Sequence, residues 1–403
     1  MEEPQQTSGV ALRDEATRLA VPRYPGTAGD DEVIERVATA LEQAGCEVRR
    51  QEFDYDLTPV WRLLRVMLAT AALALAVATG LLESRPLAAI VVLAVAVGGG
   101  ISLLGWFPWL ERLYRRPGST VTSNVEGVVP AAGRPLILLM AHHDSKSQNL
   151  TMLERGMLTV VALLSVLGVL VLATGVLAGA VAAPAAWARW LVGGTGVVAL
   201  VLLSTLRSGN ESPGGVDNAG SLAVLLALAQ RLPARIGDRA ELRFLSTGAE
   251  EDHMIGAMRY LDRHFPDGPG ERPVYVLNLD GAGAPGRIVL LERYGFGYWF
   301  SKELSELARR EAEALGLRPR GVLLPPGMGI DAIPFAHRGL PCLTLSSGSL
   351  GRATLAVHSA ADRAENLDPE TLEAVYRLTE RMAERLAEGE TDALSRAPLR
   401  AES

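Results

Sequence analysis

The stretch Leu242-Arg-Phe-Leu-Ser-Thr-Gly-Ala-Glu250-Glu251 decides the fold, because it has the form of a strand that ends in two adjacent carboxylates. Its first half is largely apolar, and the small residues Gly248 and Ala249 then favour a turn. Two neighbouring carboxylates at a strand end repel each other unless a cation or a shared proton lies between them. Taken alone, such a pair usually belongs to a solvated turn, so its meaning depends on the rest of the chain.

Strands and helices alternate through the polar parts of the chain, which predicts an α/β fold. Besides the strand that starts at Leu242, strands are predicted at 46–53, 124–129, 135–140, 274–280, 287–291 and 341–345. Helices are predicted at 32–44, 219–232, 254–265, 301–315, 331–335 and 370–386. Asp217 or Asn218 is placed to cap the helix at 219. We expect residues 1–14 to be frayed and 389–403 to form a disordered tail.

The composition points to lipid and away from nucleic acid. Hydrophobic residues make up 48% of the 403 residues and the mean hydropathy is +0.18, which is high for a soluble protein. The net charge of −7 provides no basic field of the kind that binds nucleic acid. The two cysteines, Cys46 and Cys342, lie far apart and predict neither a disulfide framework nor a thiolate zinc site. The sequence does not indicate an oligomeric state.

Four apolar runs predict membrane spans. They occupy 66–82, 87–106, 157–181 and 188–206, and each approaches the roughly 20 residues that cross about 30 Å of hydrocarbon as a helix. The short joints at 83–86 and 182–187 make two hairpins, and a buried helical hairpin is the alternative to the first. We expect the hairpins to occupy 61–111 and 157–206. An even number of spans lets 1–60, 112–156 and 207–388 share one compartment and form one domain.

Basic residues near the spans predict the orientation. Arg85 and Arg189 lie on the hairpin-turn side, and Trp106 and Trp109 suit a membrane interface. The opposite flanks hold eight basic residues: Arg62, Arg65, Arg112, Arg115, Arg116, Lys146, Arg155 and Arg207. Under the positive-inside rule this excess puts the globular domain in the cytoplasm. Two unpaired cysteines and a start that does not resemble a signal peptide agree with that prediction.

Polar side chains follow several of the predicted strands. Ligands gather at the carboxyl ends of strands in an α/β sheet. Each residue alone has an ordinary explanation, such as a helix cap or a hydrogen-bonded histidine. Together they form the nitrogen and oxygen donor set that suits a pair of divalent ions, zinc first. The residues are His142, Asp144, Asp217, Glu250, Glu251, Asp280 and His358.

These segments resemble the zinc aminopeptidases of the M28 type, a family of two-metal peptidases. The resemblance covers the whole chain outside the apolar runs, and both hairpins are insertions relative to soluble members. It implies a mixed twisted sheet flanked by helices. Six motifs occur in the family's order: Ala141-His-His-Asp-Ser, Gly215-Val-Asp-Asn-Ala-Gly, Gly248-Ala-Glu-Glu, Asn278-Leu-Asp-Gly, Gly329-Ile-Asp-Ala-Ile-Pro-Phe and His358-Ser-Ala-Ala-Asp.

The resemblance also implies a role for each site residue. His142 and Asp280 would bind one metal, Glu251 and His358 the other, and Asp217 would bridge the two. Glu250 would be the general base, and Asp144 would orient the imidazole of His142. Asp331 matches a family segment near the substrate. The histidines that match no ligand position are His143, His253, His264 and His337.

The resemblance therefore implies a hydrolase of the membrane, a two-zinc aminopeptidase that removes residues from peptides with a free N-terminus. Two alternatives remain open. A single-zinc glutaminyl cyclase uses a similar acid set, Asp331 included. A catalytically silent receptor or scaffold could keep the peptidase fold, although such proteins usually lose their ligands. A cluster of four aromatic residues could line a substrate pocket or belong to the core: Tyr294, Phe296, Tyr298 and Trp299.

Overall fold

The computed structural model describes residues 7–105, 112–349 and 351–389. The chain separates into two compact units. The first consists of Met1–Asp54, Thr120–Ser147 and Gly209–Ser403, and the second of Tyr55–Ser119 and Gln148–Ser208. The hairpins expected at 61–111 and 157–206 fall within the second unit.

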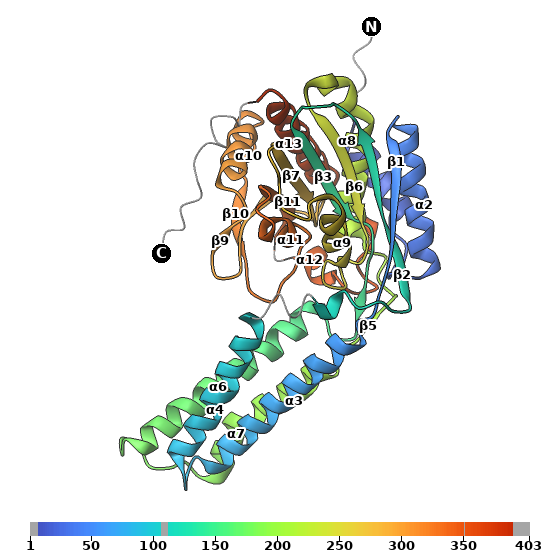
Figure 1. Cartoon of the computed structure of the whole chain (residues 1–403). Coiled ribbons are helices and arrows are strands. Elements are labelled where there is room, and N and C mark those ends of the chain that lie inside the picture. The colour runs from blue at the N-terminus through green and yellow to red at the C-terminus, as the bar shows by residue number, and fades with distance from the viewer. Residues whose placement is uncertain (1–6, 106–111, 350, 390–403) are drawn as a thin grey trace. The chain divides into compact units, whose positions relative to one another are not determined.

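The first unit is built on a mixed sheet (Figure 1). In spatial order the strands are β1 (Glu47–Tyr55), β2 (Thr120–Val129), β6 (Glu241–Thr247), β3 (Leu136–His142), β7 (Val274–Leu279), β11 (Cys342–Gly348), β8 (Arg287–Tyr294) and β10 (Arg320–Leu324). β6, β3, β7 and β11 run parallel, whereas β2 and β8 are antiparallel to their neighbours β6 and β11. Because four central strands are parallel, their carboxyl ends lie at the same edge of the sheet.

Helices cover both faces of this sheet (Figure 1). Leu136, Leu138 and Met140 of β3 belong to one buried cluster with residues of α9 (Ile255–His264) and α11 (Ala332–His337). The alternate residues of β3 point to the opposite face, where α8 (Gly220–Ile236) and α13 (Pro369–Ala387) contact the strand. The remaining helices are α1 (Gly9–Leu19), α2 (Ala28–Gln43), α10 (Lys302–Ala314) and α12 (Arg352–Ala356), and the short helical turns are η1 (Gly215–Ala219), η2 (Gly237–Arg239) and η3 (Ala364–Asn366).

The predicted mixed α/β fold is confirmed, and every predicted strand and helix of the first unit is present within a few residues of its expected bounds. The pattern missed α1, β10, α12 and three two-residue strands: β4 (Ser147–Gln148), β5 (Ser208–Gly209) and β9 (Tyr298–Trp299). β4 pairs with β5, and β9 pairs with β8.

Two local expectations are wrong. Residues 9–14 are not frayed but belong to α1, because Leu12, Ala16 and Leu19 are buried at helical spacing. Neither Asp217 nor Asn218 caps α8, whose N-cap position is Ala219 and carries no side-chain cap. Both residues lie in the preceding turn η1 instead. Residues 1–6 and the tail from 390 lie outside the described residues, as do Trp106 and Trp109.

The second unit is a bundle of α3 (Thr58–Leu81), α4 (Pro86–Gly105), α6 (Met152–Leu177) and α7 (Ala186–Ser204). α3, α6 and α7 are long and apolar enough to cross a membrane. The apolar part of α4 whose side chains are described, Pro86–Ser102, is shorter. The structure therefore provides three candidate spans where the sequence predicts four.

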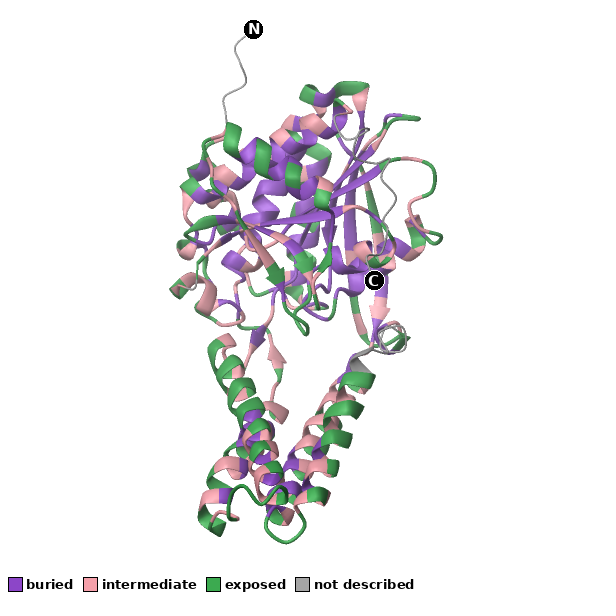
Figure 2. Ribbon diagram, turned by 90° about the vertical axis from the view of Figure 1, so that its left-hand side faces the viewer, coloured by how far each residue is buried: buried purple, intermediate pink, exposed green. Residues whose placement is uncertain are grey.

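The bundle is apolar outside as well as inside. Leu75, Leu93 and Val169 are buried between the helices. Val95 and Leu163 are among many large apolar side chains that remain exposed. Exposed residues recur along the ribbons of these helices (Figure 2). α7 approaches α3 so closely at Gly193 that a Cβ atom on this residue would lie only 2.0 Å from the Thr79 hydroxyl oxygen. Small residues at helix contacts and an apolar exterior are typical of helices packed in lipid.

A close backbone contact fixes the turn that follows β6. Gly256, in the first turn of α9, donates its N–H to the carbonyl of Gly248 at 3.1 Å. The buried side chain of Asn124 clamps the same pair, because it donates to the Gly256 carbonyl and accepts from the Gly248 N–H. A Cβ atom on Gly256 would lie 2.1 Å from the Gly248 oxygen. The turn that carries Glu250 and Glu251 therefore depends on a glycine at 256.

We predict that Gly256→Ala destabilises the first unit by about 1–3 kcal/mol, because the added methyl group forces the two segments apart. The measurement is thermal unfolding of the full-length protein with a thiol-reactive fluorophore, which reports on this unit because both buried cysteines lie in it. The matched control is Gly351→Ala, where the new Cβ meets only ordinary contacts. Equal unfolding temperatures for the two variants would contradict the prediction.

Candidate metal centre

Three parallel strands deliver polar side chains to one edge of the sheet. His142 is the last residue of β3, and Asp280 directly follows β7. Glu250 and Glu251 lie in the turn after β6. Asp217 reaches the same place from η1, and His358 from the segment after α12. The structure thus brings together residues that are up to 216 positions apart in the chain.

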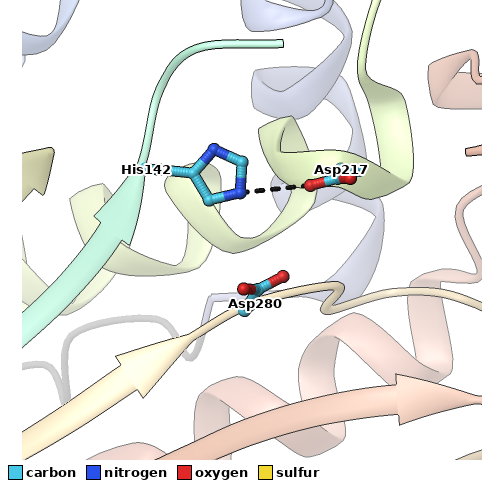
Figure 3. A group of neighbouring side chains, drawn as sticks. All are labelled: His142, Asp217 and Asp280. Atoms are coloured by element: carbon cyan, nitrogen blue, oxygen red, sulfur yellow. Dashed lines mark ion pairs between the residues drawn. The ribbon is translucent and has the colours of Figure 1, made fainter. Parts of the chain in front are cut away.

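The first group of potential ligands consists of His142, Asp217 and Asp280, whose ligand atoms all lie within 4.8 Å of one another. Figure 3 shows the three side chains converging from β3, from the turn before α8 and from the end of β7. The Nε2 atom of His142 lies 3.1 Å from Oδ1 of Asp217. On the other side of the ring, Nδ1 lies 3.4 Å from Oδ1 of Asp144.

The second group consists of Asp217, Glu251 and His358, again with ligand atoms within 4.8 Å of one another. The Nε2 atom of His358 lies 3.2 Å from Oδ2 of Asp217 and 3.0 Å from Oε2 of Glu251. Asp217 therefore presents one carboxylate oxygen to each imidazole, and it belongs to both groups.

The carboxylate of Asp144 organises the acidic turn. Its two oxygens accept the backbone N–H groups of Glu250 and Glu251 at 3.1 and 3.0 Å. Ala249, directly before the pair, has a φ of 55°, a left-handed conformation that costs a non-glycine residue about 1–3 kcal/mol. The fully buried Asp144 thus contacts His142 and also holds the turn in place.

Burial and crowding perturb the acids and bases of the cluster. Burial raises the pKa of Asp280 to about 7, since the nearby charge of His142 offsets only part of the desolvation. Burial also raises the pKa of Glu250 well above its usual value. Burial alone would lower the pKa of His358, but the Glu251 charge and the hydrogen bonds to Asp217 and Glu251 together outweigh it, and the pKa rises to about 9. The cluster thus holds more acid than its own cations neutralise.

The donor set fits divalent metal ions. Each group combines an imidazole nitrogen with carboxylate oxygens, a set that zinc accepts readily. The Oε1 atom of Glu251 is buried and has no hydrogen-bond partner among the described residues. An ion between Asp217, Glu251 and His358 would satisfy such an atom and would offset the repulsion among the acids.

The structure adds three residues to which the sequence assigned no role. Arg23 is fully buried and donates to the carbonyl oxygens of His143, Pro213 and Gly214. Asp362 accepts the N–H groups of Val216 and Asp217 at 2.8 and 3.2 Å. Lys146 lies beside Glu251. Asp362 does belong to the quoted motif that starts at His358, and Lys146 was counted only as a charge near the membrane.

Asp331 is buried near the centre, where its Oδ2 atom accepts the hydroxyl of Thr247. Its Oδ1 atom has no hydrogen-bond partner within the described part of the chain. Burial raises the pKa of Asp331 to about 6. Asp331 therefore presents a second unsatisfied carboxylate oxygen.

The other candidate residues belong to neither ligand group. His143 is buried against Ser246 and Asp30, and His337 is exposed. His264 stacks on the ring of Tyr260 at 4.3 Å, and His253 is exposed. The four aromatic residues do not share one environment. Tyr294 packs on Phe300, whereas the other three are exposed: Phe296, Tyr298 and Trp299.

The sequence matches a known peptidase family. Residues 195–383 match the model of peptidase family M28, a range that includes all the site residues except His142 and Asp144. Aminopeptidase YwaD from Bacillus subtilis (strain 168) is 29% identical over 135 residues. That alignment covers 32% of this chain and spans 28% of the length of the relative.

Solved structures share the fold at low sequence identity. A zinc aminopeptidase from Bacillus subtilis, BSAP, has a TM-score of 0.56 at 13% identity, covering 95% of this chain and 96% of its own. The aminopeptidase from Aneurinibacillus sp. strain AM-1 has a TM-score of 0.55 at 13% identity, with 94% of each chain covered. A glutaminyl cyclase from Porphyromonas gingivalis has a TM-score of 0.53 at 15% identity, covering 94% of this chain and 98% of its own.

The order of the motifs, the mixed sheet and the family match agree with one another. The resemblance to peptidase family M28 is therefore confirmed, and the family match itself covers residues 195–383.

Proposed function

We propose that the protein is a membrane-embedded metallopeptidase that uses two zinc ions to remove N-terminal residues from peptides. The observation that carries the proposal is the position of Asp217. Its two carboxylate oxygens lie 3.1 and 3.2 Å from the imidazoles of His142 and His358. Asp217 is half-buried between the two histidines, and a carboxylate in this position can bridge two cations.

We assign the ligands from the two groups. His142, Asp217 and Asp280 would hold one ion, and Asp217, Glu251 and His358 the other. When bound, such ions hold and acidify a water molecule and polarise the carbonyl of the bond to be cleaved. Asp144 positions His142 and the acidic turn, and Asp362 fixes the backbone at Asp217.

Glu250 is the general base of the proposal. It precedes a ligand directly, yet it belongs to neither ligand group, and its Oε2 atom lies 3.9 Å from Nε2 of His142. A carboxylate next to the centre but outside both groups is free to take a proton from water and to pass it to the leaving amine.

We predict that Glu250→Gln keeps both metal ions but lowers turnover about 100-fold or more, because the amide cannot accept the proton. The adjacent substitution, Glu251→Gln, is the matched control and should release one ion. The measurements are zinc content per chain and the rate of peptide hydrolysis. Loss of metal from Glu250→Gln with retention in Glu251→Gln would reverse the two assignments.

An aminopeptidase and a glutaminyl cyclase remain distinguishable by their substrates. The aminopeptidase YwaD supports peptide hydrolysis, and the similar fold of a glutaminyl cyclase, together with the buried Asp331, supports the second candidate. The full ligand set favours the peptidase, because two complete groups would be superfluous for a single ion. A silent scaffold would need neither group.

We predict that the protein releases the first residue of peptides with a free α-amine and leaves N-acetylated peptides intact, because the amine is expected to bind beside one metal. Mass spectrometry of matched free and acetylated peptides measures this, with an N-terminal glutamine peptide included. Cleavage of acetylated peptides would exclude an aminopeptidase. Loss of ammonia from the glutamine peptide without release of an amino acid would identify a cyclase.

We propose that all four helices of the second unit span the membrane, with the peptidase unit in the cytoplasm. α4 supports a fourth span because Ala89 and Leu93 pack into the buried cluster of the bundle. Among the charges of the hairpin-turn side, Arg189 pairs with Glu83. This pairing leaves Arg85 as the basic residue on the hairpin-turn side without a described ion pair. Eight basic residues lie near the opposite ends of the predicted spans.

We predict that a reporter fused at Ser84 is external and that one fused after Ser403 is cytoplasmic. Alkaline phosphatase is active only outside, and green fluorescent protein serves as the complementary cytoplasmic reporter. Phosphatase activity at the C-terminus, with fluorescence at Ser84, would reverse the orientation. It would leave the proposed chemistry unchanged.

A further inference from the structure

Lys146 lies against one proposed ligand and contacts it twice. Its Nζ atom lies 3.0 Å from Oε2 of Glu251 and donates to the backbone carbonyl of Glu251 at 2.6 Å. The side chain is only 14% exposed. Lys146 and Lys302 are the only lysines in the sequence, and every other basic residue apart from histidine is an arginine. A compact ammonium group therefore occupies this position in a chain that otherwise uses arginine.

The ammonium group shares its carboxylate oxygen with a proposed metal ligand. The same Oε2 atom of Glu251 that contacts Lys146 lies 3.0 Å from Nε2 of His358. The other oxygen, Oε1, is the buried atom without a partner. A cation held by Asp217, Glu251 and His358 would thus share the Glu251 carboxylate with a fixed positive charge.

The group around His142 has no such competitor. Among the described residues, no lysine or arginine forms an ion pair with Asp280 or Asp217. The buried Arg23 donates its hydrogen bonds to backbone carbonyls. The two ligand groups therefore have similar donor atoms but unequal charge: one group contains a carboxylate that is already paired with an ammonium ion, and the other does not.

We propose that Lys146 makes the two metal positions unequal, so that the position formed by Asp217, Glu251 and His358 binds its ion more weakly than the position formed by His142, Asp217 and Asp280. This inference rests on the proposed two-metal function. Its physical basis is that a neighbouring ammonium group repels a divalent ion and draws electron density from the shared carboxylate, which reduces its strength as a ligand.

The test is the binding of zinc alone to the metal-free full-length protein, measured by competition with chelators of graded affinity. We expect two ions per chain, the second bound at least tenfold more weakly than the first. Lys146→Met keeps the length of the side chain and removes its charge, and it should strengthen the weaker position at least tenfold. Damage to the fold weakens binding, so a gain in affinity reports on the charge itself.

Two further variants complete the test. Lys302→Met removes the other lysine, which lies over the ring of Trp299, and should leave both affinities unchanged. His358→Ala should abolish only the weaker ion, which identifies the position that Lys146 affects. Loss of the tighter ion from His358→Ala instead would overturn the proposal.

The remaining outcomes separate this inference from the proposed function. Two ions of equal affinity in the wild-type protein, or an unchanged weaker affinity in Lys146→Met, would overturn the role of Lys146 and leave the two-metal function intact. Failure of both proteins to bind a second ion would overturn the inference and the two-metal function together. A second ion bound only by Lys146→Met would support the inference in its strongest form.

Discussion

The site depends on one interaction, the pair of hydrogen bonds from the backbone of Glu250 and Glu251 to the carboxylate of Asp144. These bonds join the loop after β3 to the turn after β6, so two neighbouring strands of the sheet fix one another's polar ends. Two adjacent carboxylates would otherwise separate into solvent, since they repel each other and both are buried. The backbone hydrogen bonds, rather than the acidic side chains themselves, determine that both carboxylates face the same centre.

The sequence predicted the fold well because its signals are local. The strands that end at His142 and Asp280 are short apolar runs followed by a polar residue, and α13 shows a clear amphipathic period. α1 was missed because its three buried apolar residues, Leu12, Ala16 and Leu19, are separated by charged ones. The cap expected at Asp217 was wrong because the side chain turns toward two histidines instead of the backbone of α8.

The site was only partly predictable, for a different reason. The motifs named the residues that the structure brings together, but contacts between distant segments leave no periodic pattern. Lys146 and its partner Glu251 are 105 residues apart, and Arg23 lies 191 residues from Gly214. Nothing in the local sequence distinguishes Lys146 from a surface charge near a membrane span. The proposed roles of Glu250 as base and Glu251 as ligand likewise depend on backbone conformation, which the dipeptide alone does not specify.

The contacts of the buried Arg23 have a consequence for when the centre can form during synthesis of the chain. Its hydrogen bonds reach the loops at 143 and 213–214, while Asp362, near the other end of the chain, fixes the backbone at Asp217. Both apolar hairpins are translated before Asp217, Glu250, Glu251, Asp280 and His358. The centre therefore cannot close until translation is nearly complete, by which time the apolar hairpins have already left the ribosome. For the proposed membrane peptidase, the order of synthesis would thus withhold the metal centre until the apolar helices of the second unit are available for insertion.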